Sequence, residues 1–551
     1  MDKIWLNNYP KDVPHEISLD HYGSLNEFLS DAFSRYQSLP AIEFLGKRIS
    51  YGELDRMTDQ MAGYYRDTLK LAVGDRIAIM LPNCLQHPVS MIGAIKAGLT
   101  VVNINPLYTP RELNHALKDS GAKAIVVLEN FANTVNDAKA GTALESVILT
   151  ELGDLIGLKG KVVNFVLRYV KKMVPAHTLK GHRIKDALAK GGDLQEVARS
   201  HDDIAFLQYT GGTTGVSKGV MLTHRNILAN LEQAYVWLLS AGAEVGSERI
   251  ITALPLYHIF ALTANCFTYM RMGALAVLVP NARDIPALVK TFQAFKPTAF
   301  TGVNTLFNAL LNNPDFAKCD FSSLKLTLSG GMAAQESVAN RWKQVTGVTL
   351  LEAYGLTETS PAVCINRMDE TEFNGTVGLP LSSTEVCVRD DNGNECPIGE
   401  PGELCVRGPQ VMKGYWQRPD ATAEVLDADG WFATGDVAVI DELGRVKIVD
   451  RIKDMVLVSG FNVYPNEVEE QIAAHPGVLE AGVIGEPSEV TGEAVVAVVV
   501  KSDPSVSDED LRQWCKERLT NYKRPTRYVF KDELPKTNVG KILRRELRDL
   551  I

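Results

Sequence analysis

The sequence of 551 residues predicts a mixed fold, α/β and α+β. We expect a large N-terminal domain of layered α/β subdomains plus a β-rich subdomain, followed by a small, mobile α+β C-terminal domain. Three observations predict this fold. Apolar runs alternate with helix-like stretches from about residue 25, turn residues separate short strands at about 375–450, and a last unit of about 100 residues mixes both patterns. We place the domains at 1–450 and 451–551, with a hinge near 450–453.

The first layered region is predicted from strands and helices that follow one another in strict alternation. Apolar runs predict strands at Ile77–Met80, Leu99–Ile104 and Ala124–Leu128, and helix-like stretches lie between them at Val89–Ala97 and Pro110–Asp119. Such strand–helix–strand alternation is typical of a sheet covered by helices.

The same alternation resumes further along and then changes character. Strands are predicted at Val277–Val279, Ala299–Gly302 and Leu324–Leu328. In the section from about 375 to 450, Gly-containing turn signals separate short strands such as Glu403–Arg407 and Val437–Ile440, which indicates hairpins.

The last unit combines two helices with two strands. Helices are predicted at Asn466–Ala474 and Ser507–Leu519, and strands at Leu479–Ile484 and Ala494–Val500. A small α+β domain fits this pattern.

Composition excludes several classes of function. The formal net charge of -10 does not favour nucleic acid as a partner. The eight cysteines have no metal-ligand spacing, which is typical of a reducing compartment. The first residues lack the apolar stretch of a signal peptide, and no uncharged apolar run is long enough to span a bilayer. We therefore expect a cytoplasmic protein, and leave a homodimer open.

Residues 158–174 predict an amphipathic helix. One face carries apolar side chains and the opposite face carries basic ones: Val162, Val166, Tyr169, Val170 and Met173 against Lys161, Arg168, Lys171 and Lys172. Such a helix can lie on an anionic membrane, peripheral on its inner face. Alternatively, its apolar face packs on the core and its basic face is solvated. The second interpretation is favoured, because most amphipathic helices are structural.

Residues 209–219 form the most informative stretch of the chain. Glycines, small hydroxyl residues and one lysine follow an apolar run: Tyr209, Thr210, Gly211, Gly212, Thr213, Thr214, Gly215, Ser217 and Lys218. Glycine lets backbone amides approach an anion, hydroxyls donate to phosphate oxygens, and lysine adds positive charge. The loop is not a Walker A motif, because Ser217 rather than Gly precedes Lys218. It predicts a phosphate cradle.

Two segments with paired polar groups and glycines follow. Gly330, Gly331 and Met332 come directly after a predicted strand, where glycine permits the close approach of a flat ring. Segment 352–360 then places aromatic, hydroxyl and carboxylate groups around a glycine: Tyr354, Gly355, Thr357 and Glu358. The tyrosine could stack on a base, and the carboxylate could bind Mg²⁺ beside phosphates.

Two further segments add charge nearer the C-terminus. Asp436 follows a glycine turn and is suited to gripping ribose hydroxyls, and Arg451 and Lys453 lie a short way beyond. Lys541 follows a glycine in segment 535–545 and could neutralise charge that builds on a phosphate or a carboxylate. Taken one at a time, solvated surface groups would account for each of these signals.

Occurring together in this order and spacing, the five segments resemble the adenylate-forming superfamily of acyl-CoA synthetases, adenylation domains and luciferases. The resemblance covers essentially the full chain. It is greatest to bacterial long-chain fatty-acid–CoA ligases, through residues 105–113, 253–262, 301–308 and 450–465.

The resemblance implies an enzyme that uses ATP, Mg²⁺ and coenzyme A. A fatty carboxylate would attack the α-phosphate of ATP to give acyl-AMP and pyrophosphate, and the CoA thiol would then displace AMP. A medium-chain or aryl acid–CoA ligase is the alternative within the superfamily. A non-catalytic membrane-surface module for lipid binding or uptake is the alternative of another class.

The resemblance also implies roles for individual residues. Segment 210–218 would hold the β- and γ-phosphates, Gly330, Gly331 and Tyr354 would border the adenine, and Asp436 with Arg451 would hold the ribose. Thr357 would contact the α-phosphate, and Glu358 and Thr210 would bind the metal ion. Lys453 occupies the position of the hinge between the two domains. The implied catalytic residues are Lys541, Glu358, Thr214 and His258. The implied acyl-binding residues are His258, Thr301, Gly302, Val303, Gly331 and Met332. His258 has a second interpretation, a hydrogen-bonded core histidine.

Overall fold

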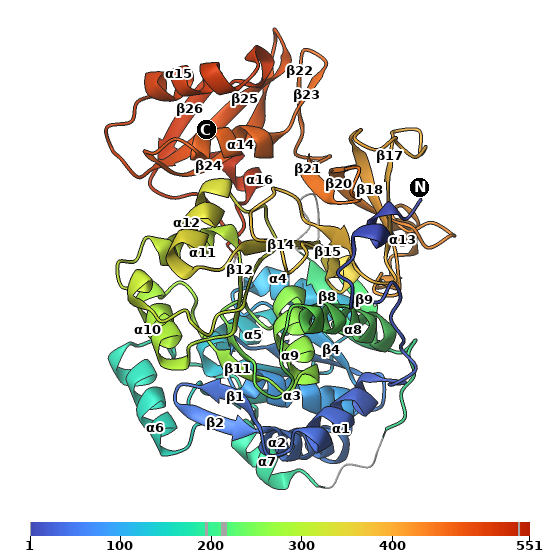
Figure 1. The fold of residues 1–551 in the computed structure, drawn as a ribbon. Helices are drawn as coiled ribbons and strands as arrows, with labels where there is room; N and C mark the ends of the chain where they lie inside the picture. Colours follow the sequence, from blue (N-terminus) through green and yellow to red (C-terminus); the bar gives the residue numbers. More distant parts are fainter. Residues whose placement is uncertain (1, 193–196, 211–216, 538–539) are drawn as a thin grey trace.

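The computed structural model describes residues 2–192, 197–210, 217–537 and 540–551. These residues form four β-sheets (Figure 1). Two large sheets with their helices make up most of the molecule. A four-stranded antiparallel sheet lies at the upper right of the view, and the C-terminal sheet lies at the top. The predicted fold class is confirmed, with a large N-terminal domain and a smaller β-containing C-terminal domain.

The first large sheet has eight strands and is parallel over most of its width. Its strand order is β19-β9-β8-β4-β3-β5-β6-β7. The strands span Gly414–Tyr415, Lys218–Thr223, Ile204–Thr210, Thr100–Asn103, Arg76–Met80, Ala124–Leu128, Ser146–Thr150 and His182–Arg183. Strands β8 and β9 form an antiparallel hairpin that contains the glycine-rich loop, with Thr210 opposite Lys218.

The second large sheet has nine strands in the order β16-β15-β14-β13-β12-β10-β11-β1-β2. The strands span Leu379–Pro380, Ala362–Ile365, Leu350–Gly355, Leu326–Ser329, Ala299–Gly302, Arg249–Thr252, Leu275–Leu278, Pro40–Phe44 and Lys47–Ser50. One continuous apolar core lies between this sheet and the first, so the two form a single packed unit.

Helices cover both large sheets. They are α1 Leu25–Arg35, α2 Tyr51–Gly63, α3 Gln86–Lys96, α4 Pro110–Ser120, α5 Ala132–Ala138, α7 Ile184–Lys190, α8 His224–Ser240, α9 Thr268–Arg271, α10 Ile285–Phe295, α11 Asn304–Leu311 and α12 Glu336–Thr346. In helix α4, residues at both ends explain where the helix begins and ends. Thr109 and Glu112 form a capping box, Pro110 fills the first turn, and Gly121 ends the helix at φ +62°.

The four-stranded sheet occupies the section where turn signals predicted hairpins. Its order is β17-β18-β20-β21, and all its pairs are antiparallel. The strands span Glu385–Arg389, Gly402–Arg407, Phe432–Ile440 and Val446–Arg451, and the short helix α13 spans Pro419–Ala423.

The C-terminal sheet has apolar clusters on both of its faces. Its strands are β22 Val456–Val458, β23 Phe461–Val463, β24 Val478–Ser488, β25 Gly492–Lys501 and β26 Arg527–Lys531. Helices α14 Pro465–Ala473 and α15 Asp508–Arg518 cover one face, and α16 Arg544–Leu547 lies against the other. Because these clusters are separate from the main core, this sheet is a packing unit of its own.

The segment 158–174 differs from the favoured prediction. It forms helix α6 Leu158–Phe165 and a π-helical turn η4 Val166–Val170, but four of the five residues on the predicted apolar face, Val162, Tyr169, Val170 and Met173, are exposed. The prediction that this face packs on the core is therefore wrong. A helical wheel identifies which residues share a face, and it does not identify which face is turned inward. Among the described residues, no helix combines the length and apolarity needed to cross a bilayer.

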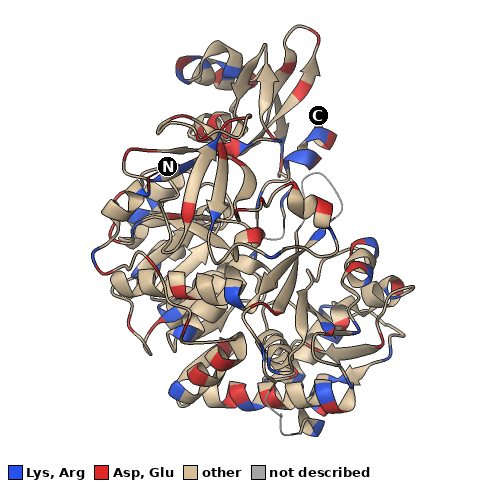
Figure 2. Cartoon of the chain, turned by 90° about the vertical axis from the view of Figure 1, so that its right-hand side faces the viewer, with Lys and Arg blue, Asp and Glu red and all other residues tan. Residues whose placement is uncertain are grey.

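Basic and acidic residues are interspersed along the helices and loops of the described chain (Figure 2). In this view the charges do not form one extended field of a single sign.

Candidate functional site

The candidate site lies where three parallel strands of the nine-stranded sheet end. In β12, β13 and β14 the register pairs Gly302 with Ser329 and Ser329 with Glu352. The segments that follow these strands therefore emerge side by side at one sheet edge, the usual position of ligand sites in parallel sheets. Gly330, Gly331 and Gly355, three of the predicted nucleotide-binding residues, all lie here.

The local structure disfavours a side chain at each of these three positions. A Cβ at Gly355 would lie 2.0 Å from the carbonyl oxygen of Pro361, and a Cβ at Gly330 would lie 2.8 Å from the Phe260 ring. Gly331 has φ +80°, in the left-handed region. Met332 packs partly buried on the core beside them.

A tyrosine, a carboxylate and a guanidinium form one network at this edge. The Tyr354 hydroxyl donates to Asp436 Oδ2 at 2.6 Å, and Arg451 Nε lies 3.2 Å from Asp436 Oδ1. Asp436 and Arg451 are direct partners across β20 and β21. Burial, followed by the Asp436 charge, raises the pKa of Tyr354 well above its usual range. The tyrosine therefore stays protonated and holds the carboxylate in place.

Glu358 is joined to the glycine-rich hairpin through a residue that the sequence reasoning missed. It lies with Thr357 in the 3-10 turn η7 Thr357–Thr359. The Tyr415 hydroxyl donates to Glu358 Oε1 at 2.9 Å, and Lys218 Nζ lies 4.7 Å from the centre of the Tyr415 ring. Burial raises the pKa of the Glu358 carboxyl. The only sequence signal for Tyr415 is its place in a Gly-Tyr-Trp turn.

The base of the glycine-rich hairpin is closed by hydrogen bonds. Ser217 Oγ donates to the Thr210 carbonyl at 2.5 Å, and His115 Nε2 lies 2.9 Å from the Ser217 carbonyl oxygen. The Tyr209 hydroxyl donates to Asp119 at 2.8 Å. The predicted phosphate-binding residues within this hairpin lie outside the described residues: Gly211, Gly212, Thr213, Thr214 and Gly215.

Lys541 reaches this site from the C-terminal sheet. The carbonyl oxygen of Gly540 accepts a hydrogen bond from Thr305 Oγ1 at 3.2 Å, which fixes the lysine loop against α11. Loss of hydration, followed by the charge of Arg451, lowers the pKa of Lys541 to about 8. The lysine thus lies within electrostatic reach of the Asp436–Arg451 pair. Lys453 is exposed just beyond this pair.

His258 lies within electrostatic reach of Lys541. Its Nδ1 accepts from the Phe260 backbone N–H at 3.3 Å, so the neutral ring carries its proton on Nε2. Burial, followed by the charge of Lys541, lowers the pKa of His258 to about 4. His258 is thus a partly buried, hydrogen-bonded histidine near the lysine, and its role toward the carboxylate and the thiol stays a prediction.

Three of the six predicted acyl-binding residues, Thr301, Gly302 and Val303, lie at the end of β12. Thr301 is buried, and its Oγ1 donates to Asn265 Oδ1 at 2.9 Å. A Cβ at Gly302 would lie 3.0 Å from the Phe307 ring, so Phe307 fills the room that this glycine leaves. Val303 packs close to Gly540, the residue before Lys541. A Cβ built at Gly540 would lie 3.1 Å from Val303 Cγ2.

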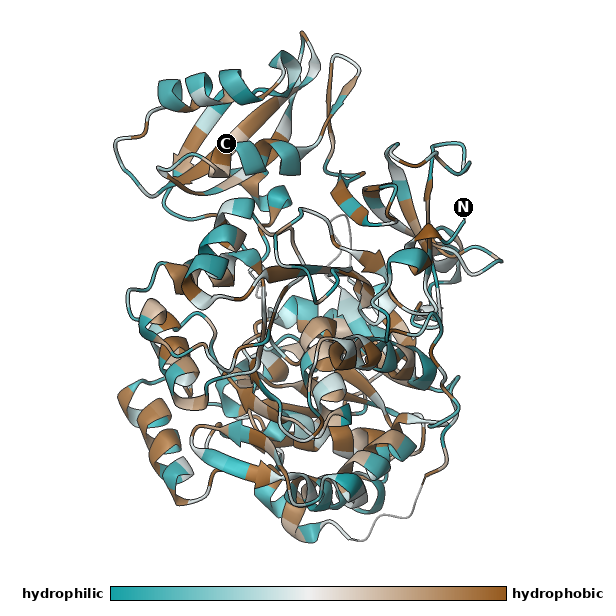
Figure 3. Ribbon diagram, viewed as in Figure 1, coloured by the Kyte–Doolittle hydropathy of each residue, from teal (hydrophilic) through white to brown (hydrophobic). Residues whose placement is uncertain are grey.

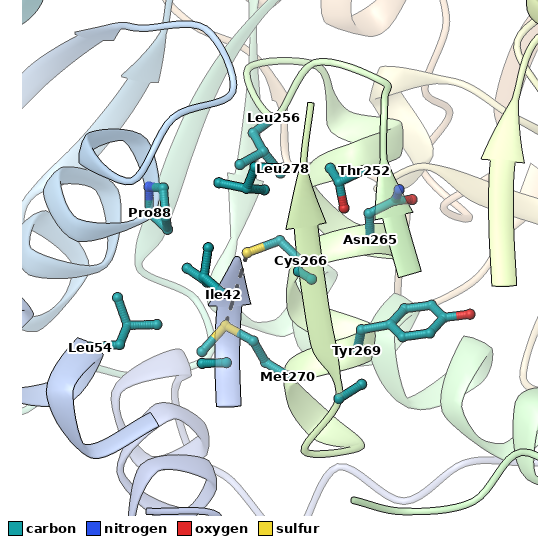
Figure 4. A pocket seen from close by; sticks show the side chains of 13 residues that line it. Ile42, Leu54, Pro88, Thr252, Leu256, Asn265, Cys266, Tyr269, Met270 and Leu278 are labelled. Atoms are coloured by element: carbon teal, nitrogen blue, oxygen red, sulfur yellow. Dashed lines mark hydrogen bonds between the residues drawn. The ribbon is translucent and has the colours of Figure 1, made fainter. Parts of the chain in front are cut away.

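An apolar cavity of about 20 Å³ lies behind Asn265, deeper in the core (Figure 4). Asn265, Thr252 and Cys266 contribute to its wall, and the remaining lining is aliphatic apart from Tyr269 and Met270. Within the described chain, Asn265 Nδ2 and Thr252 Oγ1 are buried without a hydrogen-bond partner. Asn265 could not be singled out from the sequence, since it lies within an apolar run, in the π-helical segment η5 Ala261–Phe267.

Glu352 is a third residue to which the sequence assigned no role. Its Oε1 accepts from the Ala334 N–H at 2.8 Å, which ties the loop after Gly331 to β14. Burial raises the pKa of this carboxyl to about 8. It supports the loop rather than facing a ligand.

Comparison with protein-family models identifies the class of protein. The family described as AMP-binding enzyme matches residues 29–416, and the AMP-binding enzyme C-terminal domain matches residues 467–541. The chain belongs to the AMP-binding enzyme family.

Individual relatives match over the whole length. The chain is 53% identical to a long-chain-fatty-acid–CoA ligase of Escherichia coli O6:H1, over 100% of this chain and 98% of that protein. It is 37% identical to the ligase of that name from Bacillus subtilis, over 99% and 97% of the two chains.

Solved structures share the fold. ATP-bound MatB from Rhodopseudomonas palustris matches with a TM-score of 0.83 and 30% identity, over 96% of this chain and 99% of that one. The anthranilate CoA ligase AuaEII, in complex with anthranoyl-AMP, matches with a TM-score of 0.85 and 25% identity, over 98% of each chain.

Proposed function

We propose that the protein is an ATP-dependent ligase that activates long-chain fatty acids to acyl-CoA through acyl-AMP, releasing AMP and pyrophosphate. One observation carries this proposal: Tyr354, Asp436, Arg451 and Lys541, which come from distant parts of the chain, converge at one sheet edge. The relatives named long-chain-fatty-acid–CoA ligase, 53% identical over the whole chain, support the substrate class.

The nucleotide has a consistent place in this arrangement. Asp436 would accept from the ribose hydroxyls, with Arg451 and the Tyr354 hydroxyl fixing the carboxylate. Gly330 and Gly331 would border the adenine beside Tyr354, because a flat ring could approach Gly331, where the nearest side-chain atom would lie 3.9 Å from a Cβ. Thr357 would contact the α-phosphate. Lys218, Ser217 and Thr210 would bind the β- and γ-phosphates.

The first half-reaction joins two anions, which is why Lys541 matters. An oxygen of the fatty carboxylate attacks the α-phosphorus of ATP, and the bond from that phosphorus to the bridging oxygen breaks, so pyrophosphate leaves. Repulsion between carboxylate and triphosphate is strong where water is excluded. The Lys541 ammonium, held by the Gly540–Thr305 contact, would lie between them and stabilise the developing charge.

The second half-reaction needs a different arrangement. The CoA sulfur attacks the acyl carbon, the thiol proton is lost, and AMP leaves. Lys541 then has no charge to neutralise and obstructs the thiol. We propose that residues 451–551 move as a domain about a hinge near 450–453, which includes Lys453. His258 lies beside Lys541 and would face the reacting carboxylate and thiol.

The residues present fit a magnesium ion. Glu358 is a carboxylate whose charged form is disfavoured by burial and whose side chain accepts from one hydroxyl, that of Tyr415. Within the described residues no cluster of three or more ligating side chains occurs, which suits Mg²⁺ because it usually takes one or two carboxylates plus substrate phosphates. Glu358 would hold the ion, with Thr210 near the phosphates. When bound, it neutralises phosphate charge.

The acyl chain would follow the path from Thr301 past Asn265 to the apolar cavity. Val303 and Met332 would flank its entrance with Gly302 and Gly331. Side chains would have to move apart to admit a long chain, because the cavity measures only about 20 Å³.

Identification of the nucleotide product tests the proposal directly. The protein is incubated with ATP, Mg²⁺ and CoA, and either palmitate or benzoate. We expect AMP, pyrophosphate and palmitoyl-CoA, with little turnover of benzoate. Turnover of benzoate in preference to palmitate would favour an aryl acid ligase. Release of ADP, or no nucleotide turnover with any acid, would refute the proposal and favour a non-catalytic lipid-binding module.

Two finer sequence predictions extend this proposal. A homodimer stays a prediction. Peripheral contact with a membrane through residues 158–174 is supported by the exposed apolar side chains of that segment.

A further inference from the structure

Two cysteines face each other across strands β17 and β18 of the four-stranded sheet. Figure 3 shows hydrophobic and hydrophilic residues following one another along the strands of this sheet. The antiparallel register pairs Cys387 directly with Cys405, and both are free thiols. Directly opposite residues have their Cα atoms about 4.5–5.5 Å apart and their side chains on the same face. That separation lies within the range of a disulfide, about 4.4–6.8 Å.

The thiol pair lies on the face of the sheet that is turned away from the main core. On one side of it along the strands, Arg407 donates to the opposite Glu385 at 2.9 Å, and on the other side Arg389 stands opposite Glu403. Successive side chains of a strand point to opposite faces. The side chains that alternate with these on the two strands belong to the main core: Val386, Val388, Leu404 and Val406.

The indole of Trp431 covers the thiol pair. The guanidinium carbons of Arg389 and Arg407 lie 5.3 and 4.7 Å from the centre of this indole. Because the two arginines flank the pair at diagonally opposite corners, a ring that contacts both extends across the thiols. This cover explains why Cys387 and Cys405 are only 1% and 2% exposed although their face is turned away from the core. Trp431 itself is half-buried, so the cover lies at the surface.

A third cysteine of this sheet, Cys396, lies on the other face. Its backbone N–H donates to the Val388 carbonyl at 2.8 Å, which places it beside Val388 after the turn that ends β17. Like the Val388 side chain, it packs against the main core. Cys405, which shares a face with Cys387, is therefore the better placed partner for it.

The two thiols differ in acidity. A hydrogen bond from Cys405, supported by the charge of Arg389, lowers the pKa of the Cys387 thiol. The same bond, followed by burial, raises the pKa of the Cys405 thiol. Since the thiolate is the reactive form, Cys387 is the thiol that an oxidant attacks first, and Cys405 is the thiol that resolves the product.

Strand β18 also supports the turn in front of Asp436. Thr434 Oγ1 donates to the Leu404 carbonyl at 2.8 Å, and the Gly435 N–H donates to Glu403 Oε1 at 2.9 Å. The register between β18 and β20 shifts at the same place, which marks a bulge. A displacement of β18 next to the cysteine would therefore reach the carboxylate that is proposed to hold the ribose.

We propose that Cys387 and Cys405 form a reversible disulfide when the protein meets hydrogen peroxide, and that this disulfide weakens nucleotide binding. The Cys387 thiolate attacks one peroxide oxygen, the O–O bond breaks, and a sulfenic acid and hydroxide form. The Cys405 sulfur then attacks the Cys387 sulfur, the S–S bond forms, and the sulfenic oxygen leaves as water with the Cys405 proton. Two electrons pass from the two thiols to the peroxide, and exchange with a dithiol reverses the reaction. The effect on nucleotide binding rests on the proposed function, whereas the disulfide does not.

Peptide mass spectrometry of the full-length protein after graded exposure to hydrogen peroxide tests the disulfide. Remaining thiols are blocked with N-ethylmaleimide before digestion without reductant. We expect a cross-linked peptide pair that joins Cys387 to Cys405 and disappears after dithiothreitol. Cys405→Ala should instead accumulate sulfenic acid on Cys387, which dimedone traps, and Cys387→Ala should form neither product. Cys396→Ser, in the same sheet, is the matched control and should keep the cross-link. The proposal is overturned if peroxide produces no cross-link between Cys387 and Cys405, or if it joins Cys387 to Cys396.

Calorimetric titration with ATP, before and after oxidation, tests the effect on the nucleotide site. We expect the oxidised protein to bind ATP about 5-fold more weakly, the scale of losing one hydrogen bond that supports the bulge. Dithiothreitol should restore the affinity, and peroxide should leave ATP binding by Cys387→Ala unchanged. Equal affinity of the cross-linked and reduced proteins would overturn the link to nucleotide binding. If the reduced protein binds no ATP, the proposed function fails, and the mass spectra still decide whether the disulfide forms.

Discussion

The nucleotide side and the acyl side of the candidate site differ in how many parts of the chain build them. The nucleotide side draws Tyr354 from β14, Asp436 and Arg451 from the four-stranded sheet, and Lys541 from the C-terminal sheet. The acyl side, from Thr301 to the cavity, comes from residues 41–278 and β12. A site assembled from several sheets can be rearranged between steps, whereas one enclosed in a single core cannot. Lys541 should therefore act in one half-reaction, and the other groups in both.

Replacing the lysine should give the largest effect. In Lys541→Ala, formation of acyl-AMP should fall by at least about 100-fold, the scale of losing one donor to transition-state charge. Conversion of supplied acyl-AMP and CoA to acyl-CoA should be nearly unchanged. The two half-reactions are measured by ATP–pyrophosphate exchange and by thioester formation. Lys516→Ala, at an exposed position on α15, is the control and should alter neither. Equal losses in both half-reactions would refute the division of roles.

Replacing Asp436 should give a contrasting result, because Asp436 precedes the proposed hinge and would not move with Lys541. Asp436→Asn keeps the shape but removes the charge that pairs with Arg451 and accepts from Tyr354. We expect both half-reactions to slow by about 10-fold and ATP to bind more weakly, in line with the loss of a charged hydrogen bond. Tyr354→Phe, which removes only the hydroxyl, should have the same sign and a smaller size. A loss confined to acyl-AMP formation would contradict this prediction.

The pH dependence should also separate the half-reactions. The pKa of Lys541 is lowered to about 8, so its ammonium form is lost as pH rises through that value. Adenylation by the free enzyme should therefore decline above about pH 8, by up to about 10-fold per pH unit. Thioester formation from acyl-AMP should lack this decline. Lys541→Arg should abolish it, because a guanidinium stays charged. An unchanged alkaline limb in the arginine variant would assign the titration to another group.

Much of the fold and of the nucleotide side could be predicted from sequence, since each depends on local pattern. Alternating apolar runs predicted strands that the structure confirms, such as Ala124–Leu128 and Ala299–Gly302. Partners from distant segments could not be predicted. Tyr415 and Asn265 reach Glu358 and Thr301 only because the chain folds back on itself. The orientation of α6 was predicted wrongly because buried carboxylates, rather than apolar packing, determine which face turns inward.

The acyl side should give the smallest effect, a change of preference rather than of rate. Phe307 already fills the space over Gly302, so Gly302→Trp would disturb packing as well as chain length. Cys266 in the cavity wall is a cleaner position. Cys266→Phe should fill the cavity and shift preference towards shorter acids by a few-fold, while Cys266→Ala, which enlarges it, should not. Competition between acids of different length, read by mass spectrometry of the acyl-CoA products, measures the shift. If both variants keep the original profile while adenylation of a short acid is normal, the chain does not extend into this cavity.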